Sequence, residues 1–196
     1  TVVSIFVNPT QFNNSDDLKK YPRTLEKDIE KIKKISDKVI VFAPSVEDIY
    51  DKSVKSVSFD FDGIENQMEG KHRPGHFDGV LTVVNRLFEI IKPDIAVFGA
   101  KDYQQEILIR QMAKSLYPNL ELIKAPIIRA DNGVALSSRN NYLSEQELKL
   151  ASNLYKSLQQ SVISYNNKIS IDKIINDAQN FLKSQKLFPD YFELRD

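Results

Sequence analysis

The chain has 196 residues, which fits one domain of ordinary size, or one domain with a small appendage. Its 27 basic and 27 acidic side chains balance, which removes any bulk electrostatic attraction to nucleic acid. Its hydrophobic content of 41% argues against disorder, and the absence of cysteine excludes disulfides and cysteine-based zinc sites. No signal-peptide pattern or membrane-length apolar run is present, so we expect a cytoplasmic location by default.

Strand and helix patterns alternate along most of the chain. Short runs rich in β-branched and aromatic residues predict buried parallel strands at residues 2–7, 39–42, 95–98 and 120–123. Apolar residues at helical spacing predict helices at residues 25–35, 80–91 and 107–116. The turn residues Asp131-Asn132-Gly133 between two extended runs predict a hairpin. This order predicts an α/β fold built on a Rossmann-like parallel sheet.

The pattern changes at Ser144. The segment Ser144–Glu147 has the capping-box sequence that begins a helix, and a second helix is expected after Ser170. Residues 188–194 are a candidate closing strand. We therefore expect a Rossmann-like domain at residues 1–143 and a small α+β domain at residues 144–196.

Ligands of parallel α/β sheets bind beyond the carboxyl ends of the strands, where three polar segments lie. The first is Asn8–Phe12 (NPTQF), in which Asn8 and Pro9 turn the chain off the strand and place Gln11 over the sheet. The Gln11 amide suits a hydroxyl or carboxylate ligand. The alternative is an ordinary loop with a solvated glutamine.

The second segment, Gly99–Gln105 (GAKDYQQ), joins a strand to a helix. Gly99 lets the backbone approach a ligand, the helix start favours an anion, and Lys101 adds a charge suited to phosphate. The alternative is structural, because Asp102 and Gln105 have capping-box spacing.

The third segment is Leu136–Asn141 (LSSRNN), whose two hydroxyls and guanidinium can cradle a phosphate. The alternative is a polar loop ahead of the next helix. Elsewhere, His72 and His76 are the only histidines, and they flank Pro74-Gly75. That turn keeps them off one helical face, so we expect structural or anion-facing roles rather than metal binding.

Five motifs in this order resemble the pantothenate synthetase (pantoate–β-alanine ligase) family over the whole chain. They are Phe6–Phe12 (FVNPTQF), Tyr21–Thr24 (YPRT), Arg73–Phe77 (RPGHF), Gly99–Asp102 (GAKD) with Gln105, and Leu136–Asn140 (LSSRN). The resemblance implies a nucleotidylyltransferase-like Rossmann fold and a homodimer. It also implies a two-step reaction in which ATP and (R)-pantoate, with Mg²⁺, give pantoyl adenylate and pyrophosphate. The amine of β-alanine then displaces AMP to give pantothenate, the precursor of coenzyme A.

The resemblance also implies roles for residues at matching positions. Lys101 and the loop of Ser137, Ser138 and Arg139 match catalytic phosphate-side positions. The residues implied for pantoate or β-alanine are Gln11, Gln105, Asn8, Arg73 and His76. The residues implied for ATP are Gly99, Ala100, Lys101, Asp102, Ile128, Leu136, Ser137, Ser138 and Arg139. No metal-ligating side chain is predicted.

One family feature is missing. The family carries a His-x-Gly-His motif ahead of the strand at residues 2–7, and its histidines hold the triphosphate. This chain contains only His72 and His76, and the end of the family's C-terminal domain is also absent. We therefore expect this chain to be a piece of a longer protein, without the N-terminal and C-terminal segments of the family.

Two other functions stay open. One is a nucleotidyltransferase of related fold, against which Gln11 and Gln105 argue, because a phosphorylated acceptor would favour further cations there. The other is a non-catalytic nucleotide-binding module, since the triphosphate histidines are absent. Pyrophosphate exchange that depends on pantoate distinguishes the ligase from both.

Overall fold

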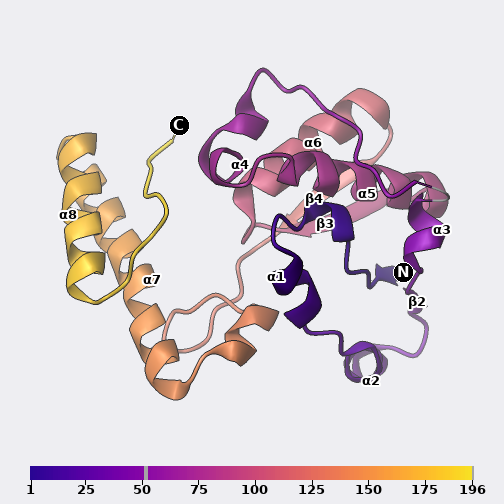
Figure 1. The fold of residues 1–196 in the computed structure, drawn as a ribbon, viewed down its shortest axis with the longest axis horizontal. Coiled ribbons are helices and arrows are strands. Elements are labelled where there is room, and N and C mark those ends of the chain that lie inside the picture. The colour runs from indigo at the N-terminus through magenta and orange to yellow at the C-terminus, as the bar shows by residue number, and fades with distance from the viewer. Residues whose placement is uncertain (51–52, 196) are drawn as a thin grey trace. The chain divides into compact units, whose positions relative to one another are not determined.

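The computed structural model describes residues 1–50 and 53–195, which form two compact units, residues 1–125 and 126–196 (Figure 1). In the first unit, β1 (Val2–Ser4) pairs in parallel with β2 (Ile40–Phe42). Likewise β3 (Ile95–Gly99) pairs in parallel with β4 (Glu121–Ala125). Helix α2 (Leu25–Ile35) lies between the first two strands in sequence, and α6 (Tyr103–Leu116) between the second two. These βαβ units confirm the predicted fold class.

Two helices supply most of the first unit's core. Helix α5 (His76–Ile91) places Leu81 and Phe88 in the core, and α6 adds Leu108 and Ile109, of which all but Phe88 are fully buried. Phe98 of β3 meets the Phe88 ring edge-on, with centroids 6.2 Å apart. Ile49 and Tyr50 reach the same cluster from α3 (Val46–Tyr50). Alternate side chains of the parallel strands therefore pack against these helices and hold the strands in place.

The expectation that the strands are buried on both faces is wrong. Burial alternates along β3, where Ile95 and Val97 are 51% and 62% exposed while Ala96 and Phe98 face the core. Ile40 of β2 and Ile123 of β4 are also exposed. The period of two that defines a strand sends alternate side chains to opposite faces, and α5 and α6 cover only one of them here.

Short helical segments were not predicted. Helix α1 begins where the Asn14 side chain accepts a hydrogen bond from the Asp16 backbone N–H at 2.7 Å. These segments are too short for a hydrophobic period to develop. They are α1 (Ser15–Lys20), α3 (Val46–Tyr50), α4 (Met68–His72) and the 3-10 turns η1 (Pro9–Gln11), η2 (Ile64–Asn66) and η3 (Ser138–Tyr142).

The second unit contains α7 (Glu145–Asn166) and α8 (Ile171–Ser184). The capping box is confirmed, since the Glu147 N–H donates to Ser144 Oγ at 3.3 Å and the Ser144 N–H donates to Glu147 Oε2 at 2.8 Å. No described helix has the length and apolarity needed to cross a membrane.

The predicted hairpin is also confirmed and belongs to this unit. Arg129 and Ala135 form an antiparallel bridge around Gly133, which has a positive φ of 88°. The Arg129 guanidinium stacks 4.0 Å from the centroid of the Tyr155 ring on α7. This contact groups the hairpin with the second unit, so the compact unit begins at Pro126. The domain boundary at residue 143 stays a prediction.

The strand expected at residues 188–194 is wrong. This segment forms no ladder with any described residue and has no regular secondary structure. Its apolar side chains instead join a small core, in which Phe192 and Leu194 pack with Ala178 and Leu182 of α8. An apolar run can satisfy burial against a helix as well as in a sheet, and its composition does not distinguish the two.

Candidate functional site

A polar cluster lies at the carboxyl end of β1, where ligand sites of this fold class are found. The Asn8 side chain is 3% exposed. Its Nδ2 donates to the Gly79 carbonyl at 3.0 Å and to Gln11 Oε1 at 3.2 Å. Asn8 therefore ties the loop after β1 to the first turn of α5 and also contacts the side chain predicted to bind substrate.

The Gln11 backbone is held from the other side by two predicted site residues. Its carbonyl accepts hydrogen bonds from Arg73 Nη2 at 3.0 Å and from His76 Nδ1 at 2.9 Å. Arg73 also pairs with Glu69 at 3.2 Å. Thus Arg73 and His76 do lie beside Gln11, and each uses a donor to fix its main chain.

The contact with a carbonyl decides the state of His76. A carbonyl only accepts, so Nδ1 carries the hydrogen, and a neutral ring then has Nε2 as an acceptor. Burial lowers the pKa of His76, against a smaller opposing effect of the Gln11 carbonyl. The nearby Arg73 charge lowers the pKa further. His76 is therefore a neutral side chain near pH 7.

Close backbone packing supports the same loop. A Cβ at Gly79 would lie 2.6 Å from the Thr10 carbonyl oxygen and 2.9 Å from the Gln11 nitrogen. These distances are shorter than real Cβ contacts allow, so only glycine lets α5 approach the loop this closely. The position of Gln11 thus depends on a glycine far along the chain.

The second predicted segment lies between β3 and α6. Lys101 Nζ donates to Asp102 Oδ1 at 2.9 Å, and both side chains are exposed. Asp102 occupies the N-cap position of α6 but its side chain makes no capping bond, so the purely structural alternative for this residue is not realised. A Cβ at Gly99 would meet nothing within 4 Å, which leaves open space beside the end of β3.

Two adjacent glutamines on α6 differ sharply. Gln104 is buried, and its Nε2 donates to the carbonyls of Ile64 and Gln67 at 2.9 and 2.8 Å. Its Oε1 accepts from the Glu69 N–H at 3.0 Å. Gln105 is half-buried, and its side chain forms no hydrogen bond with the residues that the structure describes. The hydrogen bonds of Gln104 therefore stabilise the fold, whereas the Gln105 side chain is available to a ligand.

These contacts connect the ends of β1 and β3. Glu69 pairs with Arg73 on one side and meets Gln104 on the other. The Asp102 carboxylate is close enough to His76 to raise its pKa slightly. In the first unit, the predicted Lys101 segment is therefore close enough to the predicted pantoate residues for the charge of Asp102 to act on His76.

The third predicted segment lies in the second unit. Ser137 Oγ accepts from the Arg139 N–H at 3.3 Å and begins the turn η3, while Ser138 and Arg139 are exposed. Leu136 and Ile128 are 54% and 62% exposed, on facing sides of the hairpin, where the Leu136 N–H donates to the Ile128 carbonyl at 2.9 Å. The hairpin therefore presents the Leu136 and Ile128 side chains on its surface.

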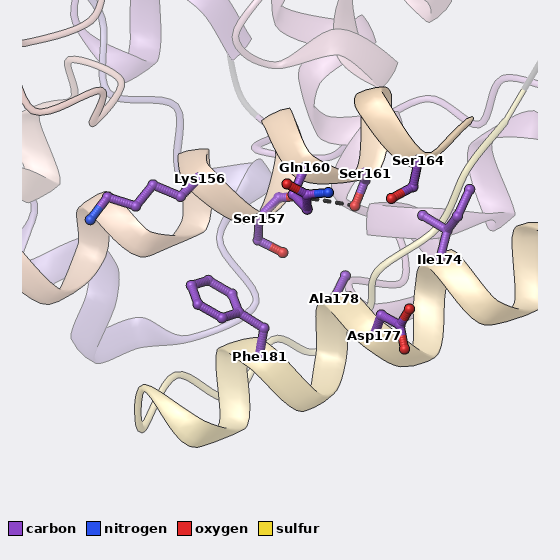
Figure 2. A pocket seen from close by; sticks show the side chains of 9 residues that line it. All are labelled: Lys156, Ser157, Gln160, Ser161, Ser164, Ile174, Asp177, Ala178 and Phe181. Atoms are coloured by element: carbon purple, nitrogen blue, oxygen red, sulfur yellow. Dashed lines mark hydrogen bonds between the residues drawn. The ribbon is translucent and has the colours of Figure 1, made fainter. Parts of the chain in front are cut away.

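The second unit also has a cavity of about 280 Å³ between α7 and α8 (Figure 2). Its wall includes Ser157, whose buried hydroxyl oxygen has no hydrogen-bond partner in the described part of the chain. None of the predicted site residues lines it. The lining residues are Lys156, Ser157, Gln160, Ser161, Ser164, Ile174, Asp177, Ala178 and Phe181.

Residues 1–50 and 53–195 contain no group of three or more His, Asp or Glu side chains that could hold a metal ion. Sequence reasoning also missed four residues that support the cluster, namely Tyr50, Thr10, Gly79 and Gln104. Thr10 lies inside a quoted motif, but its contact with Tyr50 spans 40 positions. No sequence signal identifies Tyr50, Gly79 or Gln104, because their partners are distant in the chain.

Comparison with known proteins decides the family. The family profile described as pantoate-beta-alanine ligase matches residues 1–196, which is the whole chain. The chain belongs to this family. The family prediction from the five motifs is therefore confirmed.

Individual relatives agree. The chain is 49% identical to the pantothenate synthetase of Flavobacterium psychrophilum, over all of this chain and 70% of that protein. The pantothenate synthetase of Thermus thermophilus matches 93% of this chain and 66% of its own, with 38% identity and a TM-score of 0.86. The Francisella tularensis ligase, solved with beta-gamma ATP and beta-alanine, matches all of this chain and 71% of its own at 36% identity and a TM-score of 0.86. The chain thus spans about two thirds of the length of these relatives.

Proposed function

We propose that this chain provides the catalytic platform of a pantoate–β-alanine ligase. One observation carries the proposal: at the end of β1 the Gln11 oxygen is occupied by Asn8, which leaves the amide nitrogen to donate to a ligand oxygen. Pantoate offers carboxylate and hydroxyl oxygens, which are suitable acceptors. Gln105, half-buried on α6 and without a partner among the described residues, supplies a second amide in the same unit.

The first step joins pantoate to ATP. A pantoate carboxylate oxygen forms a bond to the α-phosphorus of ATP, and the bond from that phosphorus to the bridging oxygen breaks, so pyrophosphate leaves with the electron pair. This displacement needs positioning and charge neutralisation more than covalent assistance. Lys101 can supply positive charge to phosphate oxygens, and Gly99 leaves space for their approach. We assign Ser137, Ser138 and Arg139 to the triphosphate as well, and Ala100, Asp102, Ile128 and Leu136 to ATP contacts.

The second step forms the amide. The neutral amine of β-alanine attacks the acyl carbon of pantoyl adenylate, the bond to the AMP oxygen breaks, and the amine loses a proton to solvent. Neutral His76 and charged Arg73 hold Gln11 in place during both steps through its backbone carbonyl. We propose that they act beside the β-alanine site by this positioning.

We propose that Mg²⁺ enters with ATP. Magnesium commonly keeps several waters and substrate phosphate oxygens as ligands, so it needs few protein carboxylates. When bound, the ion neutralises triphosphate charge.

Two further proposals concern the assembly and the location of the protein. We propose a homodimer, as the family resemblance implies. We propose a cytoplasmic location, where ATP is available as a substrate.

The decisive experiment is exchange of labelled pyrophosphate into ATP with β-alanine left out. We expect exchange that requires pantoate. Lys101→Ala should reduce it by about 10²–10³-fold, because a charge aimed at the transition state is lost. Its unfolding free energy should change by less than about 0.5 kcal/mol, since the Lys101–Asp102 pair is exposed.

Lys114→Ala is the matched control, because Lys114 is an exposed lysine in the last turn of α6, the helix that follows Lys101. It should keep full exchange. ATP binding without pantoate-dependent exchange in the unmodified protein would instead support the nucleotide-binding module. Equal losses of stability and exchange in Lys101→Ala would make Lys101 a structural residue.

A further inference from the structure

The hydroxyl of Tyr50 is a buried polar group that the proposed chemistry does not use. Tyr50 ends α3, is 7% exposed and packs in the core cluster of the first unit. Its hydroxyl donates to Asn8 Oδ1 at 2.5 Å, and its oxygen lies 2.9 Å from the Thr10 hydroxyl. Burial raises the pKa of Tyr50, so the hydroxyl stays protonated and remains a donor.

The partners of Asn8 fix which way its amide faces. Tyr50 and the Thr10 N–H, at 3.4 Å, both donate to Oδ1. The Gly79 carbonyl can only accept, so it requires Nδ2 on the opposite side. Without the Tyr50 hydroxyl, the oxygen of this buried amide keeps the long contact with the Thr10 N–H and one with the Thr10 hydroxyl at 3.2 Å.

This orientation passes to Gln11. Asn8 Nδ2 donates to Gln11 Oε1, so the oxygen of the Gln11 amide is turned toward Asn8. The Gln11 nitrogen forms no hydrogen bond with the described residues, and it carries two hydrogens. The amide nitrogen of Gln11 therefore presents N–H donors to a ligand, which suit a carboxylate or hydroxyl oxygen and disfavour an ammonium group.

We propose that Tyr50 is a positioning residue that acts through Asn8 to present the Gln11 amide nitrogen to an oxygen of the acid substrate. The relay runs from α3 through the loop after β1, and the Tyr50 hydroxyl reinforces the orientation of Asn8 that the Thr10 N–H and the Gly79 carbonyl require. This inference rests on the proposed function, because it assumes that Gln11 contacts pantoate. It assigns the orientation of the Gln11 amide to a residue that reaches it through Asn8.

The test compares two tyrosine-to-phenylalanine variants. Tyr50→Phe keeps the buried ring and removes the hydroxyl. Tyr117→Phe is the matched control, because the Tyr117 hydroxyl also donates to an asparagine oxygen, Asn85 Oδ1, at 2.8 Å. Urea unfolding of both variants measures the structural cost of losing such a bond. Pyrophosphate exchange then gives the KM for pantoate and for ATP.

We expect Tyr50→Phe to raise the KM for pantoate about five- to tenfold, the effect of one buried hydrogen bond, and to leave the KM for ATP unchanged. Tyr117→Phe should leave both unchanged. In a Gln11→Met background, Tyr50→Phe should add no further loss of pantoate affinity, because the amide that the relay orients is then absent. Additive losses, or equal effects on pantoate and ATP, would overturn the relay.

A spectroscopic readout separates this inference from the proposed function. The Gln11 side-chain amide signals are assigned in the NMR spectrum by their loss in Gln11→Met. Tyr50→Phe should shift them, and Tyr117→Phe should not. A shift in a protein that shows no exchange would support the relay while defeating the ligase, and unshifted signals in an active protein would defeat the relay alone.

Discussion

At the scale of single residues, His76 connects protonation to the geometry of the site. Its Nδ1–H holds the Gln11 carbonyl, and burial lowers its pKa below the ordinary value of 6.5. The unfolded chain therefore takes up a proton at a higher pH than the folded chain does. Below about pH 6.5 the unfolded state binds more protons, and the folded state loses relative stability.

We predict that the free energy of unfolding falls as the pH is lowered from 7 through the unfolded pKa of His76 toward its lower folded value. The slope should be smaller than the ~1.4 kcal/mol per pH unit that one complete proton gives. Urea unfolding at a series of pH values measures it. His76→Asn should flatten this part of the profile, because it removes the titrating ring.

His72→Gln is the control for that profile. It removes the other histidine and leaves His76, so the slope between pH 7 and the folded pKa should persist. If His72→Gln flattens the profile and His76→Asn does not, the assignment to His76 is wrong.

The sequence predicted the members of this cluster better than their contacts. Asn8, Gln11, Arg73 and His76 were all selected, and the structure brings them together. Sequence could not show that Arg73 and His76 direct donors to a main-chain carbonyl 62 and 65 positions away. Such a bond depends on how α5 packs against η1, and that packing is set by the absence of a side chain at Gly79.

At the scale of secondary-structure elements, the first turn of α6 carries a structural glutamine beside one that we propose binds pantoate. Gln104 makes three hydrogen bonds to the segment that contains η2 and α4. Gln105 makes none with the described residues. Neighbouring positions on one helix point in different directions, so each can serve a separate purpose.

We predict that Gln104→Ala destabilises the fold by about 2–3 kcal/mol, because it leaves buried polar groups unpaired. Gln105→Ala should change stability by less than about 0.5 kcal/mol and raise the KM for pantoate about tenfold, with the KM for ATP unchanged. Urea unfolding and pyrophosphate exchange on both variants measure these effects. A Gln105→Ala protein that loses stability as Gln104→Ala does would contradict the proposed role of Gln105.

Helix prediction succeeded where the helical spacing of apolar residues could repeat. The helices α2, α5, α6, α7 and α8 are long enough for apolar residues to recur over several turns. Helix α3 spans five residues and contributes Tyr50, so the residue that completes the relay lies in a segment without a readable period. The run at residues 188–194 has a strand-like composition but no partner strand among the described residues.

At the scale of the whole molecule, the two compact units differ in the size of their cores. The first unit buries Leu81, Leu108 and Ile109 completely within a large cluster. The small cluster of the second unit consists of Ala178, Leu182 and Phe192 with a few half-buried neighbours. Buried apolar surface supplies most of the free energy that opposes local opening.

We predict that backbone amides of α5 and α6 exchange with deuterium more slowly than those of α7 and α8, by at least about tenfold in protection. Hydrogen exchange measured by mass spectrometry checks this on the intact chain. Peptides from α2, whose residues are all at least partly exposed, provide an internal reference of low protection within the first unit. Equal protection of α6 and α7 would show that the chain opens as one cooperative unit.

The division at Ala125 and Pro126 also shows where sequence reasoning stops. The change of pattern at Ser144 is real, because the capping box starts α7 there. The hairpin before it nevertheless joins α7 through the stacking of Arg129 on Tyr155. A contact between residues so far apart in the chain leaves no trace in hydrophobic period or composition.

The loop of residues 8–11 is held in place by hydrogen bonds before any substrate binds. Asn8 bonds to Gly79, and the Gln11 carbonyl bonds to Arg73 and His76, so both ends of the loop are anchored to helices. Ordering a residue's backbone costs about 1–2 kcal/mol of entropy, and here that cost falls on folding rather than on ligand capture. Pantoate should therefore associate in a single kinetic phase, with an observed rate that rises linearly with its concentration.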